Sequence, residues 1–355
     1  MRILFANAHP YLPQLTGGTQ INTHYLAKAL IARGHAVAIC SGLLPSGFRA
    51  RLDQILIKTG LNRAPRNNLM RYPVYRSWFP QDELEGIASR FRPDVVVVQS
   101  GGHVPIWQKA KALRLPVAVY LHNVEYQGHA GRLAADDTTL YIANSEFTAR
   151  AYKKDFSIDS EVLRPYFDRE KFRVDHTGPY VTFFNPHPDK GVDIAIGVAS
   201  LCPEIDFQFI KTWGLGRDYE EKLRQRLRSL PNVKLLEPVM DTRKIFAETR
   251  LLLMPSQFAE TWGRVVTEAQ FSGIPAVAFD RGGLSESVGA GGLLLPCEAD
   301  PHVWAATVRD ILHDGARYRR LSEAALEQSK RRELDPDYQI SFLERLLADL
   351  VGRCR

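Results

Sequence analysis

The sequence contains few cysteines and no close cysteine pair. Its four cysteines, Cys40, Cys202, Cys297 and Cys354, lie far apart, and none of them forms a C-x-x-C motif. Widely spaced cysteines suit a reducing compartment. We expect them to be small core residues, with Cys354 as a thiol in the C-terminal tail.

Long hydrophobic runs are also missing. No uninterrupted stretch reaches about 18 apolar residues, so we expect no membrane-spanning helix. Residues 1–6 lead directly into a short apolar strand, without the longer apolar region and small-residue cleavage site of a secretory signal. We therefore expect a cytoplasmic protein, and a peripheral position at the inner face of the membrane remains open.

The excess of positive charge is small but concentrated. The formal net charge is +6. Between Arg49 and Arg76 a single acid, Asp53, accompanies seven basic residues: Arg49, Arg51, Lys58, Arg63, Arg66, Arg71 and Arg76. Two interpretations stay open, a solvated surface or a patch that contacts an anionic acceptor or membrane face. No stacking-aromatic or recognition-helix pattern accompanies the charge, so we expect no nucleic-acid partner.

Length and composition indicate a globular protein with more than one domain. A chain of 355 residues is too long for one ordinary hydrophobic core. Apolar residues make up 45% and charged residues 24%, which is typical of globular rather than disordered proteins.

Short apolar strands alternate with helical stretches along the whole chain. In the first half we predict strands at 3–6, 36–40, 95–98, 117–121 and 139–143, and helices at 20–33, 83–90, 106–113 and 145–154, the last with Ser145 as N-cap. In the second half we predict strands at 180–184, 207–210, 233–236, 251–254, 276–279 and 292–295, and helices at 192–201, 219–230, 243–248, 265–272 and 303–313. A final amphipathic helix runs from Asp337 to about Val351. Continuous apolar strands between helices are typical of parallel sheets covered on both faces.

This pattern predicts an α/β fold of two doubly wound, Rossmann-like domains that face a cleft. Residues 164–179 contain two prolines, a glycine and several charges, so we place the linker there. The predicted domains comprise residues 1–165 and 166–335, and a helix within 336–355 is expected to cross back to the first domain. Ligands of doubly wound sheets bind at the carboxyl ends of the strands, so the cleft is the expected site.

A pair of glycines follows the first predicted strand. Gly17-Gly18-Thr19 lies directly before the helix predicted at Gln20. Two glycines let the backbone approach an anion closely, and a helix N-terminus offers unpaired N–H groups. The segment fits a diphosphate-binding turn or an ordinary strand-to-helix turn. It is neither a P-loop nor G-x-G-x-x-G, and Trp213-Gly214-Leu215-Gly216 also lacks the third glycine, so NAD binding is not expected.

The strongest local signal is the segment 260–268, which reads Glu-Thr-Trp-Gly-Arg-Val-Val-Thr-Glu. Gly263 frees the backbone for close approach, and the N–H groups of residues 263–265 open a helix, which suits an anion or a sugar hydroxyl. Glu268 can accept hydrogen bonds from a vicinal diol such as that of ribose, and Glu260 can reach sugar hydroxyls. A helix cap with a solvent-facing glutamate is the alternative.

Several motifs together resemble those of the retaining group 1 (family 4) glycosyltransferases, which have the GT-B fold. The motifs are Pro255-Ser256, the E-x7-E pair, Ala269-x-x-Ser272-Gly273-Ile274-Pro275, Gly282-Gly283-Leu284-Ser285-Glu286, Gly17-Gly18, His122-Asn123 and Ala143-Asn144-Ser145. The resemblance covers nearly the whole chain and is most specific in residues 251–296. It implies a hexosyltransferase of polysaccharide biosynthesis that moves a sugar from a UDP- or GDP-sugar to a hydroxyl of a glycan, lipid-linked or small-molecule acceptor. Residues 1–165 would then form the acceptor side and residues 166–335 would bind the nucleotide-sugar.

The resemblance also implies roles for individual residues. Gly17 and Gly18 would hold the diphosphate through backbone N–H groups, and Lys190 would neutralise it. Glu260 would hold hydroxyls of the donor sugar, and Glu268 would bind the ribose. His122 would orient the donor sugar near its anomeric carbon, with a core histidine as the alternative. The remaining donor-binding residues are expected to be Asn185 and, beside Glu260, Trp262, Gly263, Arg264 and Val265.

One position departs from the family pattern. The family usually has an arginine about five or six residues before the lysine, and Asn185 stands near that position here. Either Lys190 and the glycine loop hold the diphosphate, or another cation such as Arg264 substitutes. Donor affinity and leaving-group activation depend on the answer.

The resemblance implies a metal-independent front-side mechanism, in which a donor phosphate oxygen takes the proton of the acceptor. We expect neither a metal nor a cofactor. Asp335-Pro336-Asp337 has a D-x-D form but precedes the last helix, so it is predicted to be a cap. The histidines show no metal-ligand spacing, and no G-x-S-x-G elbow supports Ser-His-Asp hydrolysis.

Two other functions remain as alternatives. A nucleotide-sugar epimerase or a phosphorylase could use the same scaffold, and a non-catalytic sugar-nucleotide binding protein could have lost part of the phosphate clamp. The segment from Glu237 to Met240 is expected near the nucleotide base. The acceptor is expected at the loops around 49–76, Gly101–His103 and Tyr126-Gln127.

Overall fold

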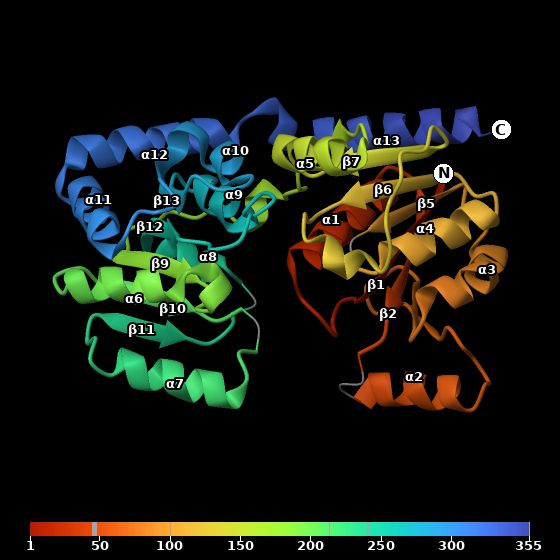
Figure 1. Ribbon diagram of the computed structural model, residues 1–355, viewed down its shortest axis with the longest axis horizontal. Coiled ribbons are helices and arrows are strands. Elements are labelled where there is room, and N and C mark those ends of the chain that lie inside the picture. The colour runs from red at the N-terminus through yellow and green to blue at the C-terminus, as the bar shows by residue number, and fades with distance from the viewer. Residues whose placement is uncertain (45–47, 100, 213, 240, 355) are drawn as a thin grey trace. The chain divides into compact units, whose positions relative to one another are not determined.

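The computed structural model describes residues 1–44, 48–99, 101–212, 214–239 and 241–354, without the side chains of 48–50. Trp213 and Met240, which belong to two of the segments considered above, and the side chain of Arg49 lie outside the described residues. The chain divides into two compact units, and Figure 1 shows the elements of each. Unit 1 comprises Met1–Phe167 and Asp335–Arg355, and unit 2 comprises Asp168–Leu334.

Unit 1 is built on a sheet in the order β3-β4-β2-β1-β5-β6-β7-β8. Its strands are β1 (Arg2–Pro10), β2 (Ala36–Gly42), β3 (Arg66–Asn67), β4 (Val74–Ser77), β5 (Val95–Gln99), β6 (Val117–Leu121), β7 (Thr139–Ala143) and β8 (Glu161–Val162). The described pairs are parallel except β3 with β4. Its helices are α1 (Gly18–Ala32), α2 (Phe48–Lys58), α3 (Pro80–Phe91), α4 (His103–Ala112), α5 (Glu146–Phe156), α13 (Pro336–Arg353) and the 3-10 turn η1 (Tyr126–His129).

The inner strands of unit 1 are buried on both faces. Residues 3–6 of β1 pair with 37–40 of β2 and with 95–98 of β5. One face packs on α13 through Leu343, Leu347 and Leu350, and the other packs on α3 and α4. Burial on both faces explains why these strands are continuous apolar runs rather than alternating ones.

Two caps predicted from the sequence are confirmed. The hydroxyl of Ser145 accepts the backbone N–H of Thr148 over 3.0 Å at the start of α5. The carboxylate of Asp335 accepts the backbone N–H of Tyr338 over 2.8 Å at the start of α13. The D-x-D form at 335–337 is therefore a helix cap.

Unit 2 is a parallel sheet in the order β11-β10-β9-β12-β13-β14. Its strands are β9 (Tyr180–Phe184), β10 (Phe207–Ile210), β11 (Val233–Leu236), β12 (Thr249–Met254), β13 (Ala276–Phe279) and β14 (Gly292–Leu295). Its helices are α6 (Val192–Leu201), α7 (Arg217–Leu227), α8 (Arg243–Ala247), α9 (Arg264–Gln270), α10 (Leu284–Val288), α11 (Pro301–His313) and α12 (Gly315–Ser329). Buried side chains of β9, β10 and β12 pack on α6, α7 and α11 to form its main core.

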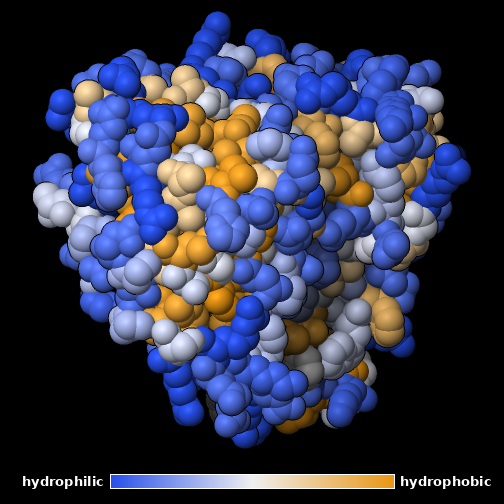
Figure 2. Space-filling model, turned by 60° about the vertical axis from the view of Figure 1, so that its left-hand side comes forward, coloured by the Kyte–Doolittle hydropathy of each residue, from blue (hydrophilic) through white to orange (hydrophobic). Residues whose placement is uncertain are grey.

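Figure 2 shows hydrophilic side chains over much of one face, with hydrophobic residues gathered between them. None of the helices in the described residues has both the length and the apolar character needed to cross a membrane.

Candidate active site

The loops that carry the predicted donor-binding residues follow neighbouring strands of unit 2. β9 is the first strand of this sheet, β10 and β11 are added on one side of it, and β12 to β14 on the other. The strand order therefore reverses between β9 and β12, and ligands of doubly wound sheets bind at the carboxyl ends of the strands at such a switch point. Lys190 follows β9 and Glu260 follows β12.

Lys190 and Glu260 form an ion pair at this switch point. Nζ of Lys190 lies 2.6 Å from Oε1 of Glu260, and Oγ of Ser256 donates to the same oxygen over 3.0 Å. The ammonium group also lies 4.4 Å from the centroid of the Phe258 ring. The Lys190 and Glu260 side chains are 15% and 12% exposed. A cation and a carboxylate are thus held together in a largely buried place that solvent still reaches.

Gly191 lets the loops after β9 and β12 come together. It adopts a left-handed conformation with φ 81° and caps α6. A Cβ atom there would lie 2.0 Å from the carbonyl oxygen of Pro255, which no side chain tolerates. The N–H of Gln257 donates to the carbonyl of Asp189 over 2.7 Å. These backbone contacts bring Lys190 within reach of Glu260.

A glycine pair after β13 holds the backbone of Glu260 from the other side. The N–H of Gly283 donates to the carbonyl of Glu260 over 2.6 Å. A Cβ on Gly282 would lie 2.3 Å from that oxygen, and one on Gly283 would lie 2.2 Å from the carbonyl oxygen of Thr261. Close backbone approach therefore requires glycine at both positions. Loops after three strands together position the Glu260 carboxylate.

The second glutamate of the E-x7-E pair lies on α9. Gly263 caps this helix with φ 75°, and Val265 is half-buried in its first turn. Nη2 of Arg264 lies 3.4 Å from Oε1 of Glu268, with the two side chains 13% and 14% exposed. Burial raises the pKa of Glu268, and the Arg264 guanidinium partly offsets that rise. Arg264 is thus paired with Glu268 on the same helix.

Trp262 is a core residue of unit 2. Its side chain is 1% exposed, and its indole N–H donates to the hydroxyl of Thr267 over 3.0 Å. The ring is therefore almost fully shielded from solvent, and the donor-binding role that the resemblance implies for Trp262 stays a prediction. Its buried ring fixes the turn that leads through Gly263 into α9.

Asn185 lies at the end of β9, on the side of β10. Its backbone adopts φ 59°, a left-handed conformation that asparagine tolerates better than most residues. Its N–H donates to the carbonyl of Ile210 over 2.8 Å, and its side-chain oxygen accepts the hydroxyl of Thr212. Arginines adopt similar positive φ values at three other positions of this chain, so this backbone alone does not explain the departure from the family pattern.

The loops after β10 and β11 carry a charged network that the sequence does not predict. Nζ of Lys211 lies 2.7 Å from carboxylate oxygens of both Glu220 and Glu237. Nη2 of Arg224 lies 2.7 Å and 3.0 Å from the same two carboxylates. Glu237 belongs to the segment expected near the nucleotide base, and here it is held by two cations. A lysine directly after a buried strand is the sequence signal for this network.

Gly17 and Gly18 lie in unit 1, after β1. Gly17 has an extended backbone and caps α1, which begins at Gly18. The loop before them is anchored from two sides. The Tyr11 and Tyr72 hydroxyls are joined by a 2.7 Å hydrogen bond, and Nη2 of Arg76 donates to the carbonyl of Leu12 over 2.7 Å. These contacts fix the start of the loop that leads from β1 to α1.

Arg76 belongs to this anchor and not to the basic patch expected at 49–76. Its side chain is 1% exposed, and Nη1 donates to the hydroxyl of Ser41 over 3.3 Å. Burial lowers the pKa of its guanidinium, while Asp53 and the two tyrosines act in the opposite direction. The charge pattern alone could not separate this buried arginine from its exposed neighbours.

His122 follows β6 in unit 1 and is half-buried. Its ring lies 4.1 Å from that of Tyr120, measured between centroids. The Asn144 side chain lies 3.5 Å from the His122 carbonyl and is itself held by the Thr148 hydroxyl over 2.8 Å. His122-Asn123 and Asn144-Ser145, which both contributed to the resemblance, therefore lie together at the ends of β6 and β7.

Unit 1 also contains a pair of buried histidines that was not predicted from the sequence. His103, at the start of α4, lies 4.2 Å from His129 between ring centroids, and both are buried. Neither ring nitrogen of His103 has a hydrogen-bond partner among the described residues. Burial lowers the pKa of His103 to about 3, helped by His129 and His122, so its imidazole is neutral at pH 7.

The predicted site residues thus fall into two sets. Lys190 contacts Glu260, and Arg264 contacts Glu268, all in unit 2, while Gly17, Gly18 and His122 belong to unit 1. Among the described residues no group of three or more His, Cys, Asp and Glu side chains is arranged to hold a metal ion.

Comparison with protein families assigns both halves of the chain. Residues 16–170 match the family described as Glycosyltransferase Family 4, and residues 167–328 match the family described as Glycosyl transferases group 1.

Curated relatives match parts of the chain. An exopolysaccharide phosphotransferase of Streptomyces coelicolor is 32% identical over 173 residues, 47% of this chain and 18% of that protein. A D-inositol 3-phosphate glycosyltransferase of Nocardioides sp. is 34% identical over 130 residues, 33% of this chain and 28% of that protein. The matches therefore span less than a third of the length of these relatives.

Solved structures match nearly the whole chain. Anabaena HepE in complex with UDP and glucose has a TM-score of 0.76 at 19% identity and covers 98% of this chain and 99% of its own. Sucrose-phosphate synthase of Thermosynechococcus elongatus has a TM-score of 0.76 at 15% identity, with 99% of both chains covered. At these identities the likeness shows the fold, which is the predicted GT-B fold. With both halves matched and the fold shared, the chain belongs to the group 1 (family 4) glycosyltransferases.

Proposed function

We propose that this protein transfers a hexose-type sugar from a nucleoside-diphosphate sugar to an acceptor hydroxyl, with retained anomeric configuration and without a metal ion. Family membership supports the class of reaction. HepE, which shares the fold, was crystallised with UDP and glucose and with UDP-glucose, which favours UDP or a related nucleotide as the donor carrier.

The observation that carries the proposal is the Lys190–Glu260 pair at the switch point of unit 2. A diphosphate presents several anionic oxygens, and Nζ of Lys190 would turn to them when the donor binds. Glu260 would then accept hydrogen bonds from donor-sugar hydroxyls in place of the lysine. A partly buried ammonium stabilises a departing diphosphate more strongly than an exposed one, because the surrounding dielectric is lower.

The second pair would hold the nucleoside. Glu268 would accept hydrogen bonds from the two ribose hydroxyls, and Arg264 would keep its carboxylate ionised against the burial that raises its pKa. Asn185 cannot supply the missing cation, so Lys190 is the principal cation for the diphosphate. The roles that the resemblance implies for Gly17, Gly18 and His122 of unit 1 stay proposals.

The bond changes of a front-side transfer balance without an outside base. The bond between the anomeric carbon and the diphosphate oxygen breaks, and the acceptor oxygen bonds to the same face of that carbon. The acceptor proton passes to an oxygen of the departing diphosphate. The protein needs to stabilise charge and hold geometry, which is electrostatic preorganisation.

The test begins with donor binding. Unfolding temperature is measured with UDP-, GDP-, ADP- and dTDP-sugars, because a ligand bound to the folded state stabilises it. Turnover of the best donor is then measured for Lys190→Ala and Glu260→Ala, each expected to lose about 100- to 1000-fold. Matched controls are Lys330→Ala and Glu327→Ala, which break an exposed Lys–Glu pair at the C-terminal end of α12. Unchanged rates in both site variants would refute the assignment.

The alternatives predict other outcomes. An epimerase would interconvert a UDP-sugar with no acceptor present. A non-catalytic binding protein would show the donor-dependent rise in unfolding temperature without any turnover.

A further inference from the structure

Exposed hydrophobic side chains concentrate in one segment of unit 1. Among the described residues nine large hydrophobic side chains are exposed, and six of them lie between residues 52 and 79: Leu52, Ile55, Leu61, Leu69, Trp78 and Phe79. Ile55, Leu61 and Phe79 expose 56%, 78% and 61% of their surface. Single exposed hydrophobic residues are ordinary, whereas a group of them marks an interaction surface.

The helix in this segment turns its apolar side to solvent. Leu52 and Ile55 are three residues apart on α2, so they lie on one side of the helix. Leu61 follows shortly after the helix. Figure 1 shows α2 standing apart from the sheet of unit 1, and it shares few contacts with the other elements. A helix that only covered the core would bury these side chains instead.

The exposed charges of the same segment are all positive. Between residues 51 and 76 the exposed ionisable side chains are Arg51, Lys58, Arg63, Arg66 and Arg71. The single acid of this stretch, Asp53, is 2% exposed. Basic and apolar groups therefore alternate along one exposed stretch of chain, with no acidic side chain at the surface between them.

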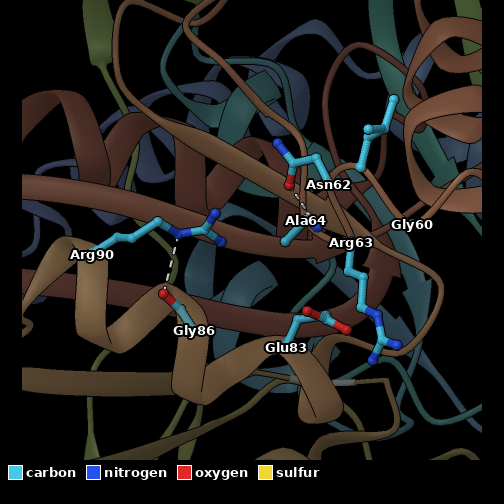
Figure 3. A pocket seen from close by; sticks show the side chains of 8 residues that line it. Gly60, Asn62, Arg63, Ala64, Glu83, Gly86 and Arg90 are labelled. Atoms are coloured by element: carbon cyan, nitrogen blue, oxygen red, sulfur yellow. Dashed lines mark hydrogen bonds between the residues drawn. The ribbon is translucent and has the colours of Figure 1, made fainter.

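An open hollow of about 490 Å³ lies beside Leu61. Arg63 and Arg90 line it together with Glu83, and Figure 3 shows the two guanidinium groups with the Glu83 carboxylate among them. Nε of Arg90 donates to the carbonyl of Gly86 over 3.1 Å. Two cations and one carboxylate leave a net positive charge, next to the most exposed hydrophobic side chain of the segment.

We propose that residues 51–79, the docking segment, bind the surface of an anionic phospholipid bilayer. Its apolar side chains enter the boundary between headgroups and acyl chains, and its basic side chains contact headgroup phosphates. The hollow between Arg63 and Arg90 accepts one such phosphate. This combination fits an anionic bilayer because it pairs apolar anchors with cations of one sign.

The inference deepens the proposed function, since it places the enzyme where a lipid-borne acceptor would be met, and it rests on that function only in this respect. Vesicle binding requires no sugar transfer. A failure of the membrane proposal leaves donor binding unaffected, and a failure of donor binding leaves the vesicle result standing.

The test is cosedimentation of the full chain with vesicles of phosphatidylcholine alone or mixed with phosphatidylglycerol. The protein is expected to bind the anionic vesicles at least tenfold more tightly, and added salt is expected to weaken this binding by screening. Ile55→Ser combined with Phe79→Ser is expected to lower affinity about tenfold or more. Val303→Ser is the matched control, because Val303 is 45% exposed on α11 in unit 2.

The charges are tested separately. Arg63→Gln and Arg90→Gln are each expected to weaken binding roughly fivefold, and Glu83→Gln is expected to strengthen it by a similar factor. Arg319→Gln with Arg320→Gln, on α12, is the control for loss of positive charge elsewhere. The unfolding temperature of each variant shows that it remains folded.

Three outcomes would overturn the proposal. The first is equal binding, or none, to both kinds of vesicle. The second is an equal loss of binding in the docking-segment variants and their controls. The third is self-association without vesicles that Ile55→Ser and Phe79→Ser abolish, because the occupant would then be a second copy of the chain.

Discussion

The two sheets of this protein place different chemistry at the same topological position. In unit 2 the strand order reverses between β9 and β12. The loops there hold Lys190 and Glu260, with Nζ of the lysine 2.6 Å from Oε1 of the glutamate. In unit 1 it reverses between β1 and β5, and the loops there carry Gly17, Gly18 and the neutral imidazole of His103. One switch point is charged, and the other offers backbone N–H groups and neutral side chains.

The buried cations of the two units differ in their hydrogen-bond partners. Burying a charge is costly unless a partner compensates it, so a cation persists at such a place when it serves a ligand or a structural contact. Lys190 is paired with Glu260, and we propose that it exchanges this partner for an anionic ligand. In unit 1 the buried cation Arg76 donates hydrogen bonds to the Leu12 carbonyl and the Ser41 hydroxyl. It thereby supports the loop that precedes the glycine pair.

The most severe test exchanges the two charges of unit 2. Lys190→Glu combined with Glu260→Lys preserves an ion pair but puts a carboxylate where the diphosphate needs a cation. The chain is expected to fold, and turnover to fall more than about 1000-fold. The same exchange of Glu327 and Lys330 at the C-terminal end of α12 serves as control. Turnover within tenfold of the wild type would mean that the pair is structural.

The second test asks whether the charged switch point depends on close backbone approach. Gly191→Ala adds a Cβ 2.0 Å from the Pro255 carbonyl oxygen, whereas Gly34→Ala has a similar φ of 85° and no atom within 4 Å. Gly34→Ala is expected to lower the free energy of unfolding by roughly 1–2 kcal/mol. Gly191→Ala is expected to lower it by at least about 2 kcal/mol more, as measured by chemical denaturation. Equal losses would show that the loops can separate at little cost.

The third test concerns the buried cation of unit 1. Arg76→Met leaves the Leu12 carbonyl and the Ser41 hydroxyl without their donor, and a loss of about 3 kcal/mol in unfolding free energy is expected. Donor affinity should fall much less than in Lys190→Ala. Arg51→Met, at an exposed position of α2, should change stability by less than about 0.5 kcal/mol. A loss of turnover as large as that of Lys190→Ala would mean that Arg76 serves the ligand directly.

The smallest expected effect tests the neutrality of the unit 1 switch point. Because the pKa of His103 is about 3 in the folded state and near 6.5 when unfolded, the wild type should lose stability as pH falls from 6.5 toward 3. Between pH 7.5 and 5 this one group should cost about 2 kcal/mol. His103→Phe removes the titrating group, so its unfolding free energy should depend less on pH over that range.

The control for this test is His302→Phe on α11, where the histidine is exposed. It controls for the loss of a histidine side chain as such. An unaltered pH dependence in His103→Phe would show that folding does not lower the pKa of this imidazole.

Much of the fold could be predicted because its signals are local. The four valines at 95–98 form β5, and the Ser145 and Asp335 caps lie where the sequence places them. α12 is not predicted, although Asp314 before a run of good helix formers is a usable signal, and its carboxylate does accept the N–H groups of Ala316 and Arg317. β3 has two residues and no signal of its own. α2 is not predicted either, although Leu52, Ile55 and Leu56 have helical spacing.

The candidate site could also be predicted only in part. Glu260, Glu268, Lys190 and the glycine pairs could be selected from the sequence, because spacing and glycine content are visible in one dimension. Burial is not visible there, so the sequence does not show that Trp262 is buried, and Arg76 was expected within a surface patch. An arginine carries the same charge, and a tryptophan the same ring, in the core and at the surface. The residue type therefore does not reveal whether the side chain is buried.

By itself the sequence determined the alternation of strands and helices, the helix caps and the residue types available for binding an anion, since each depends on neighbours within a few positions. Only the tertiary structure decided that Lys190 meets Glu260 across 70 residues of chain, that Gly191 must lack a side chain, and which arginines are exposed. The physical reason is that strand order decides which loops lie side by side, and strand order results from packing of the whole sheet.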